Sequence, residues 1–393
     1  MAIDWRKKGC ILYYLVAGIR MRFTGPVFLL VATIPWICAT GALRRTEAFR
    51  VRPIDALVHA VTWNVNGKRP KAYMDISPLL FFEESLHYQP DVIAVGFEEL
   101  VPLNARQVVL ASSSNLKAWA ESIARALFRV YRRTGYYMVA REQLVGVGML
   151  VFVRKDVQVG DVESTTVKTG LKGYAGNKGG VVVRLTVNGA PISLVTSHLA
   201  AGQSHTVDRA RDFHTIMKKA RFRSGRSIIN SDAIIWMGDL NYRVELPREK
   251  VLTALSQYQA DRLLPYDQLT KALLARQVFV GFIEAPITFA PTYKYDIGTD
   301  RYDTSQKMRV PSWTDRILYS GSANALLYTR VDGQDFTISD HRPVKGMFAV
   351  RATHSAQSHD NVGPIRHSRR RDGFRSSVRQ LNPFGGPQIQ MIS

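Results

Sequence analysis

Polar residues stand directly after two apolar runs of this chain, and some are of types that can hydrolyse a phosphate ester. Asp239 follows the run AIIWM, Asn241 comes two residues later, and His198 ends the run PISLVTS. An aspartate placed after a strand can hold or deprotonate a water molecule, and an asparagine amide can donate to a phosphoryl oxygen. The pattern is only moderately specific, because Asp-x-Asn also makes ordinary turns and a single histidine is most often structural.

Two further segments offer oxygen ligands for a metal ion. TWNVNG places Asn66 at the end of one apolar run, and DVIAVGFEEL places Glu98 and Glu99 at the end of another. Carboxylate and amide oxygens suit Mg²⁺, which keeps several waters and needs few protein ligands. Each segment has a plainer interpretation as well, because Asn before Gly is usually a turn and adjacent glutamates are usually solvated.

A histidine with a possible carboxylate partner occurs near the end of the apolar region. PSWTDRIL contains Asp315 and Arg316, and SDHRPV contains Asp340 and His341. A carboxylate that fixes the tautomer of a histidine, so that the imidazole can contact a phosphate, is a recurring arrangement in such sites.

These residues require a framework that brings strand ends together. Strand-like apolar runs alternate with two segments of helical periodicity at 116–131 and 208–222. The strand-like runs lie at 57–65, 91–97, 145–153, 179–187, 191–199 and 233–240. This alternation predicts a layered α/β domain, with mixed sheets covered by helices and functional residues at the strand ends.

Composition restricts the class of protein. The chain has 393 residues, is 46% hydrophobic and carries a formal charge of +21, which favours an anionic partner such as nucleic acid, a membrane surface or a polyphosphorylated substrate. Its two cysteines, Cys10 and Cys38, provide no disulfide framework for the main domain. Because no GxxxxGK[ST] or strand-linked GxGxxG loop occurs, nucleotide-driven chemistry has no support.

The two ends differ from the middle. Residues 1–52 contain an apolar run, GPVFLLVATIPWICATGAL, which favours a membrane anchor over a cleaved signal peptide or a leader without an anchoring role. Residues 351–393 are rich in Arg, Ser and Gly, which predicts a basic, disordered tail that either binds anionic lipid or is simply solvated. The middle, 53–350, is expected to be one catalytic domain.

The combined motifs resemble the inositol polyphosphate 5-phosphatase family. They are TWNVNG, TGLKGYAGNKGGV, SHLAAGQ, WMGDLNYR, PTYKYD, PSWTDRIL and SDHRPV, in the order and spacing of the family, and the likeness covers about 57–348. The resemblance implies a DNase I-like fold, a four-layer α/β sandwich with two mixed β-sheets flanked by helices.

The resemblance also implies roles for individual residues. Asn66 and Glu99 would help to hold Mg²⁺, with Asp340 beside the metal. Asp239 would activate the water molecule. Asn241 and His198 would stabilise the phosphoryl oxygens, and His341, oriented by Asp315, would contact the scissile phosphate.

A second set of residues would bind the rest of the substrate. The family grips the phosphate next to the one removed with residues that correspond to Tyr293, Lys294, Lys307 and Arg309, and Asn177 with Lys178 also matches family positions directed toward inositol phosphates. Two positions depart from the family. Glu98 stands where the family usually has Gln, and Lys172 where it has a small residue. An extra carboxylate at Glu98 could raise the pKa of its neighbour or attract a second cation.

The resulting prediction is a membrane-associated, Mg²⁺-dependent phosphatase whose catalytic domain faces the cytoplasm. It would remove the 5-phosphate from phosphoinositide lipids or soluble inositol polyphosphates, by direct attack of water and with no nucleic acid as partner. The alternatives are a nuclease or sphingomyelinase-like phosphodiesterase of the same fold, and an inactive lipid-binding scaffold. The oligomeric state stays open.

Overall fold

The structure, a computed structural model, describes residues 54–83, 89–101, 108–170 and 175–353. The predicted anchor in 1–52, Lys172 and all but the first residues of the predicted tail lie outside these ranges. Among the helices that are described, none is both long and apolar enough to cross a membrane.

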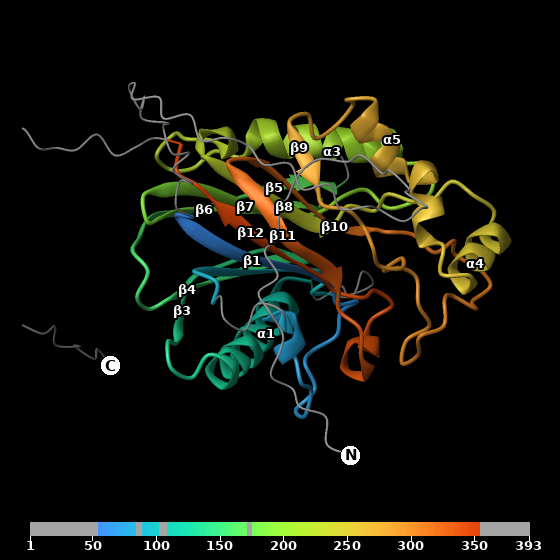
Figure 1. The fold of residues 1–393 in the computed structure, drawn as a ribbon, viewed down its shortest axis with the longest axis horizontal. Helices are drawn as coiled ribbons and strands as arrows, with labels where there is room; N and C mark the ends of the chain where they lie inside the picture. The colour runs from blue at the N-terminus through green and yellow to red at the C-terminus, as the bar shows by residue number, and fades with distance from the viewer. Residues whose placement is uncertain (1–53, 84–88, 102–107, 171–174, 354–393) are drawn as a thin grey trace, which may run out of the picture. The chain divides into compact units, whose positions relative to one another are not determined.

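Two six-stranded sheets form the centre of the molecule (Figure 1). The first sheet has the order β11 (Ala323–Arg330), β12 (Val344–Val350), β1 (Ala56–Asn64), β2 (Val92–Glu98), β4 (Val147–Arg154) and β3 (Tyr136–Leu144). The second has the order β5 (Val159–Thr169), β6 (Ala175–Val187), β7 (Ala190–His198), β8 (Ala233–Asp239), β10 (Asp315–Gly321) and β9 (Phe282–Glu284). Both sheets are mixed, because β1–β2 and β7–β8 are parallel pairs among antiparallel neighbours.

Helices cover the outer faces of the two sheets. The described α-helices are α1 (Val108–Val130), α3 (Thr206–Lys219), α4 (Arg248–Ser256) and α5 (Gln268–Leu274). The described 3₁₀ helices are η1 (Ser77–Leu79), η3 (Ile228–Asn230), η4 (Ala260–Tyr266) and η5 (Gln334–Ile338). Figure 1 shows α1 on one side of the paired sheets and α3 with α5 on the other.

Three apolar layers hold these elements together. Valine, isoleucine and leucine side chains of both sheets pack between them, among them Val58, Val183 and Ile235. The outer face of the first sheet packs against α1, where Trp63 meets Trp119 at 5.2 Å between ring centroids. On the outer face of the second sheet, α3 and α5 contribute to a layer around Trp236. The predicted four-layer α/β sandwich is confirmed.

Strand direction brings the predicted site residues to one edge. The parallel pairs β1–β2 and β7–β8 each end with polar residues, and β10 and β12 run antiparallel to β8 and β1, so that they begin at the same edge. In the register of the second sheet, His198 pairs with Asp239, and Asp239 pairs with Asp315. Three residues from distant motifs therefore lie in one row across β7, β8 and β10.

Candidate active site

His341 lies between two carboxylates of this row. Its Nδ1 is 2.9 Å from Asp315 Oδ2, and its Nε2 is 3.9 Å from Asp239 Oδ2. All three residues are buried. Although burial alone would lower the pKa of His341, the negative charges of Asp315, Asp239 and Asp340 raise it well above its usual value. These charges favour the protonated form of His341, and Asp315 fixes the orientation of its ring.

Two threonines that the sequence did not single out hold Asp315 in place. Thr292 Oγ1 donates to Asp315 Oδ2 at 2.6 Å, and Thr314 Oγ1 donates to the same oxygen at 2.8 Å. Their positions, one within PTYKYD and one within PSWTDRIL, give a signal only after the family motifs are recognised. The carboxylate of Asp315 is thus committed to His341 and to two hydroxyl groups.

Asp239 lies where residues from both sheets meet. Asn64, at the end of β1, donates through Nδ2 to Asp239 Oδ2 at 2.9 Å, and His198 Nε2 is 3.2 Å from the same oxygen. Burial would raise the pKa of Asp239, but the nearby His198, His341 and Lys178 hold it well below its usual range. Asp239 is thus an ionised, oriented acceptor. Asn64 was missed, because its neighbour Asn66 in TWNVNG carried the family assignment.

Arg243 determines which way the Asn241 amide points. Its Nη2 donates to Asn241 Oδ1 at 2.5 Å, while Asn241 Nδ2 donates to the carbonyl oxygen of Leu199 at 3.1 Å. A guanidinium only donates hydrogen bonds, so the amide must present its oxygen to Arg243. One hydrogen of Asn241 Nδ2 then remains available for another acceptor. Sequence reasoning did not identify Arg243, although it lies two residues beyond Asn241.

The same arginine connects this amide to the predicted substrate side. The guanidinium carbon of Arg243 lies 4.4 Å from the ring centroid of Tyr293, and the Tyr293 ring lies 4.5 Å from that of His341. Arg243, Tyr293 and His341 thus form a continuous series of planar groups, which restricts the position of each ring.

The predicted metal ligands lie at the same edge and are less buried than His198, Asp239 and Asp315, which together are called the catalytic row after their predicted role. Asn66 Nδ2 donates to Asp340 Oδ1 at 3.0 Å, and the backbone N–H of Gly67 donates to the carbonyl of Glu99 at 2.6 Å. Glu99 Oε1 is 4.0 Å from His198 Nε2. Asn66 and Glu99 have positive φ angles of 46° and 50°, so both leave the strand geometry at this point.

These donors fit a hard divalent cation. The bond from Asn66 to Asp340 leaves Asn66 Oδ1 and Asp340 Oδ2 as oxygen donors, and Glu99 supplies a carboxylate, which is the donor chemistry that Mg²⁺ and Ca²⁺ require. Asp239, Asp315 and His341 also have ligand atoms within 4.8 Å of one another. The contacts of Asp315 indicate instead that this trio orients the histidine.

Glu98 points away from this oxygen cluster. Its carboxylate accepts from Thr196 Oγ1 at 2.8 Å and from Thr62 Oγ1 at 3.1 Å, and it is fully buried. Burial, which outweighs the two hydroxyl donors, raises its pKa to about 8. The second-cation hypothesis for Glu98 therefore has no support from its position, because both oxygens are engaged by threonine hydroxyls.

The predicted substrate residues form two groups. Lys294 Nζ lies 4.0 Å from Asp340 Oδ2, and Lys178 Nζ is in close contact with His198 Nε2. Lys307 and Arg309 are exposed on the loop after Lys294. In this loop, the backbone N–H of Asp303 donates to the carbonyl oxygen of Lys294 at 2.8 Å. Asn177 is exposed beside Lys178. Tyr293, Lys294 and Lys178 are thus at the site, whereas no described contact joins the Lys307 or Arg309 side chains to the catalytic row.

The fold and its strand-end site define a protein of DNase I-like architecture. The family model described as Endonuclease/Exonuclease/phosphatase family 2 matches residues 61–347. A solved structure of the inositol polyphosphate 5-phosphatase domain of SPsynaptojanin, in complex with inositol (1,4)-bisphosphate and calcium ion, has a TM-score of 0.68 and 38% identity. The match covers 75% of this chain and 84% of that chain. The chain belongs to the inositol polyphosphate 5-phosphatases, within endonuclease/exonuclease/phosphatase family 2.

Two other similarities show how far this membership extends. Inositol-1,4,5-trisphosphate 5-phosphatase 1 of Schizosaccharomyces pombe is 43% identical over 257 residues, which are 65% of this chain and 24% of that protein. The chain spans about a quarter of the length of the curated relatives it matches. Cimex nitrophorin, solved as a ferrous NO complex, is 26% identical with a TM-score of 0.58 over 76% of this chain and 99% of that chain. Since its structure holds ferrous NO, the fold alone does not establish an activity.

Proposed function

We propose that this protein hydrolyses the 5-phosphate of inositol polyphosphates or phosphoinositides with the help of Mg²⁺. The observation that carries the proposal is the position of His341, held by Asp315 and facing Asp239, beside the oxygen donors Asn66, Glu99 and Asp340. The named activity of the relatives and the inositol bisphosphate bound to the SPsynaptojanin domain support the substrate class.

Each side chain has a definable task in this reaction. Asp239, ionised and oriented by Asn64, accepts the proton of a water molecule as the water oxygen attacks phosphorus. The bond between phosphorus and the inositol oxygen breaks, this oxygen takes up a proton from solvent, and Asp239 returns its own proton to solvent. The products are inositol with one phosphate fewer and inorganic phosphate. His341 and the free hydrogen of Asn241 Nδ2 stabilise the negative charge on the phosphoryl oxygens. When bound by Asn66, Glu99 and Asp340, Mg²⁺ would neutralise charge on the same phosphate.

The substrate preference is a further part of the proposal. Lys294, beside Asp340, and Tyr293, beside His341, would contact the phosphate adjacent to the reacting one. Association with a membrane, through residues 1–52 and the basic residues of 351–393, with the catalytic domain on the cytoplasmic side, stays a prediction from the sequence.

Release of phosphate from a 4,5-bisphosphorylated inositol lipid with Mg²⁺ tests the proposal. Asp239→Asn should lower kcat by about 100- to 10,000-fold, because the amide cannot accept the proton of water. Asp261→Asn, at an exposed carboxylate, is the matched control and should retain activity. A chain that cleaves single-stranded DNA or sphingomyelin faster than the inositol lipid would overturn the assignment, as would an unaltered rate in Asp239→Asn.

A further inference from the structure

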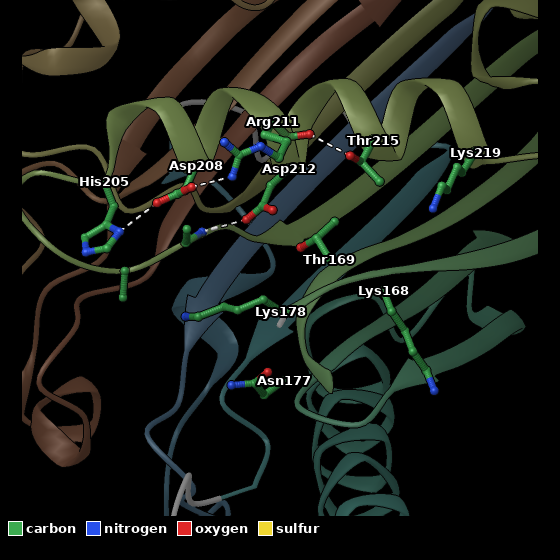
Figure 2. A pocket seen from close by; sticks show the side chains of 13 residues that line it. Lys168, Thr169, Asn177, Lys178, His205, Asp208, Arg211, Asp212, Thr215 and Lys219 are labelled. Atoms are coloured by element: carbon green, nitrogen blue, oxygen red, sulfur yellow. Dashed lines mark hydrogen bonds and ion pairs between the residues drawn. The ribbon is translucent and has the colours of Figure 1, made fainter. Parts of the chain in front are cut away.

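A cavity of about 750 Å³ lies next to the catalytic row, between α3 and the strands β5 and β6 (Figure 2). Arg211, Thr215 and Lys219 line it from α3, at the spacing of one helix face. Lys168, near the end of β5, and Lys178, at the start of β6, line it from the sheet. Lys178 also contacts His198, so this lysine lies between the cavity and the proposed active site.

The acidic side chains of the cavity are already engaged by other groups. Asp208 Oδ2 is 2.8 Å from His205 Nδ1, and its Oδ1 accepts from Arg211 Nη1 at 2.5 Å. Asp212 Oδ2 accepts from the backbone N–H of Ala200 at 2.9 Å, and burial raises the pKa of this carboxyl. Figure 2 draws these contacts as dashed lines. The lining as a whole holds two carboxylates and four cations, which are Lys168, Lys178, Arg211 and Lys219.

Lys168 and Lys219 therefore leave the cavity with an excess of positive charge. Both are exposed, and neither forms an ion pair with any residue that the structure describes. They come from different elements, β5 and α3, and Figure 2 shows both on the side of the cavity away from the Lys178 ammonium group. Two unpaired cations from separate elements at one concave surface attract an anion with more than one oxygen.

Lys219 also has a simpler explanation. It lies in the last turn of α3, where a cation is favoured by the helix dipole. Lys218 in the same turn already satisfies that preference, and Lys168 has no helix to stabilise. The dipole therefore accounts for one of the two lysines and does not explain why they share a cavity.

We propose that this cavity binds a second phosphate group, other than the one that is hydrolysed, through Lys168 and Lys219. This inference rests on the proposed function, because that function identifies the neighbouring site as the one that hydrolyses a phosphate. The phosphate could belong to the same inositol substrate, at a ring position outside the 4,5 pair, or to the head group of a separate anionic lipid. The cavity volume is sufficient for either source, since ligand sites typically occupy about 300–1,000 Å³.

The test compares Lys168→Gln/Lys219→Gln with the control Lys117→Gln/Lys155→Gln. The control removes the same charge from two exposed lysines on α1 and after β4. KM is measured for a soluble inositol trisphosphate and for an inositol bisphosphate with only the 4,5 pair. Rates are also measured on phosphatidylcholine vesicles that contain 4,5-bisphosphorylated inositol lipid, with and without phosphatidylserine. Both terminal segments are present in all variants, so the difference between them reports on the cavity.

A KM raised about 5- to 10-fold for the trisphosphate, but not for the bisphosphate, would assign the site to a phosphate of the substrate. If KM is unchanged for both soluble substrates, but the stimulation of the rate by phosphatidylserine falls by a similar factor, the site belongs to a separate lipid. If both double variants behave alike in every assay, the proposal is overturned.

Binding separates this proposal from the proposed function. If the unmodified chain releases no phosphate from any of these substrates, the proposed function fails. The cavity is then judged by calorimetric binding of the trisphosphate in EDTA. Weaker binding by the cavity variant than by the control supports the site, and equal binding refutes it. Thermal unfolding of each variant, with Lys168→Gln alone as a milder change, shows that the fold is retained.

Discussion

Glu98→Gln should stabilise the folded chain, and by more as the pH rises. Burial raises the pKa of the Glu98 carboxyl from 4.5 to about 8. Between pH 4.5 and 8, this carboxyl is therefore protonated in the folded state and ionised in the unfolded state. Stability therefore falls as pH rises through this window and is constant above it. At about 1.36 kcal/mol for each pH unit, the cost above pH 8 is on the order of 5 kcal/mol.

Glutamine avoids this cost without changing the shape of the side chain. Thr62 and Thr196 now donate to the Glu98 carboxylate, and a hydroxyl group can equally accept from an amide N–H. The glutamine amide therefore resembles the protonated acid, and the difference in unfolding free energy between variant and wild type should be small at pH 5.

Urea denaturation at pH 5, 7 and 8.5 in EDTA measures this difference. We expect the gap between Glu98→Gln and wild type to widen by several kcal/mol from pH 5 to 8.5, with most of the change complete by pH 8. Glu121→Gln, on the exposed face of α1, is the matched control for the loss of one carboxyl group. A constant gap for Glu98→Gln would refute the argument that its carboxyl is protonated in the folded protein.

Two further predictions concern the catalytic row and the substrate side. Asp315→Asn should move the alkaline limb of the pH–rate profile to lower pH, because Asp315 is the largest of the charges that raise the pKa of His341. An unmoved limb in kcat/KM would contradict this role. Lys294→Ala should raise KM about 10-fold for substrates with a 4-phosphate. Hydrolysis of an ester without a neighbouring phosphate should be unchanged, and equal losses on both substrates would count against the proposed contact.

The sequence predicted the buried strands better than the exposed ones. The runs at 57–65, 191–199 and 233–240 correspond to β1, β7 and β8, whose side chains are almost all buried and therefore give long apolar signals. β3 and β5 were missed, because they lie at the edges of the two sheets and most of their residues are partly exposed. The last four strands, β9 to β12, were missed as well, although β12 is buried throughout. Helix α1 begins at Val108, eight residues before the predicted start, because the serines ahead of Leu116 interrupt the apolar period.

Motifs predicted which residues meet at the site, but they did not predict how these residues are held. Asn64, Thr292 and Arg243 each bond to a predicted catalytic residue, and none has a sequence feature that separates it from an ordinary polar residue. The partner of Asn64 is 175 positions away and that of Thr292 is 23 positions away, so these two contacts depend on the fold rather than on local sequence. Arg243 bonds to a residue two positions before it. Such supporting bonds can be identified only from a three-dimensional structure.

Glu98 and Glu99 show why adjacent residues of one type can have opposite roles. Side chains alternate between the faces of a strand, and Glu98 is the last residue of β2, so its carboxyl enters the space between the two sheets. Glu99 has a φ of 50°, which ends the strand and turns its carboxylate toward His198 at the edge. A substitution at Glu98 should therefore act mainly on stability, whereas one at Glu99 should act on catalysis. The same chemical change at the two positions, from Glu to Gln, separates these effects in one comparison.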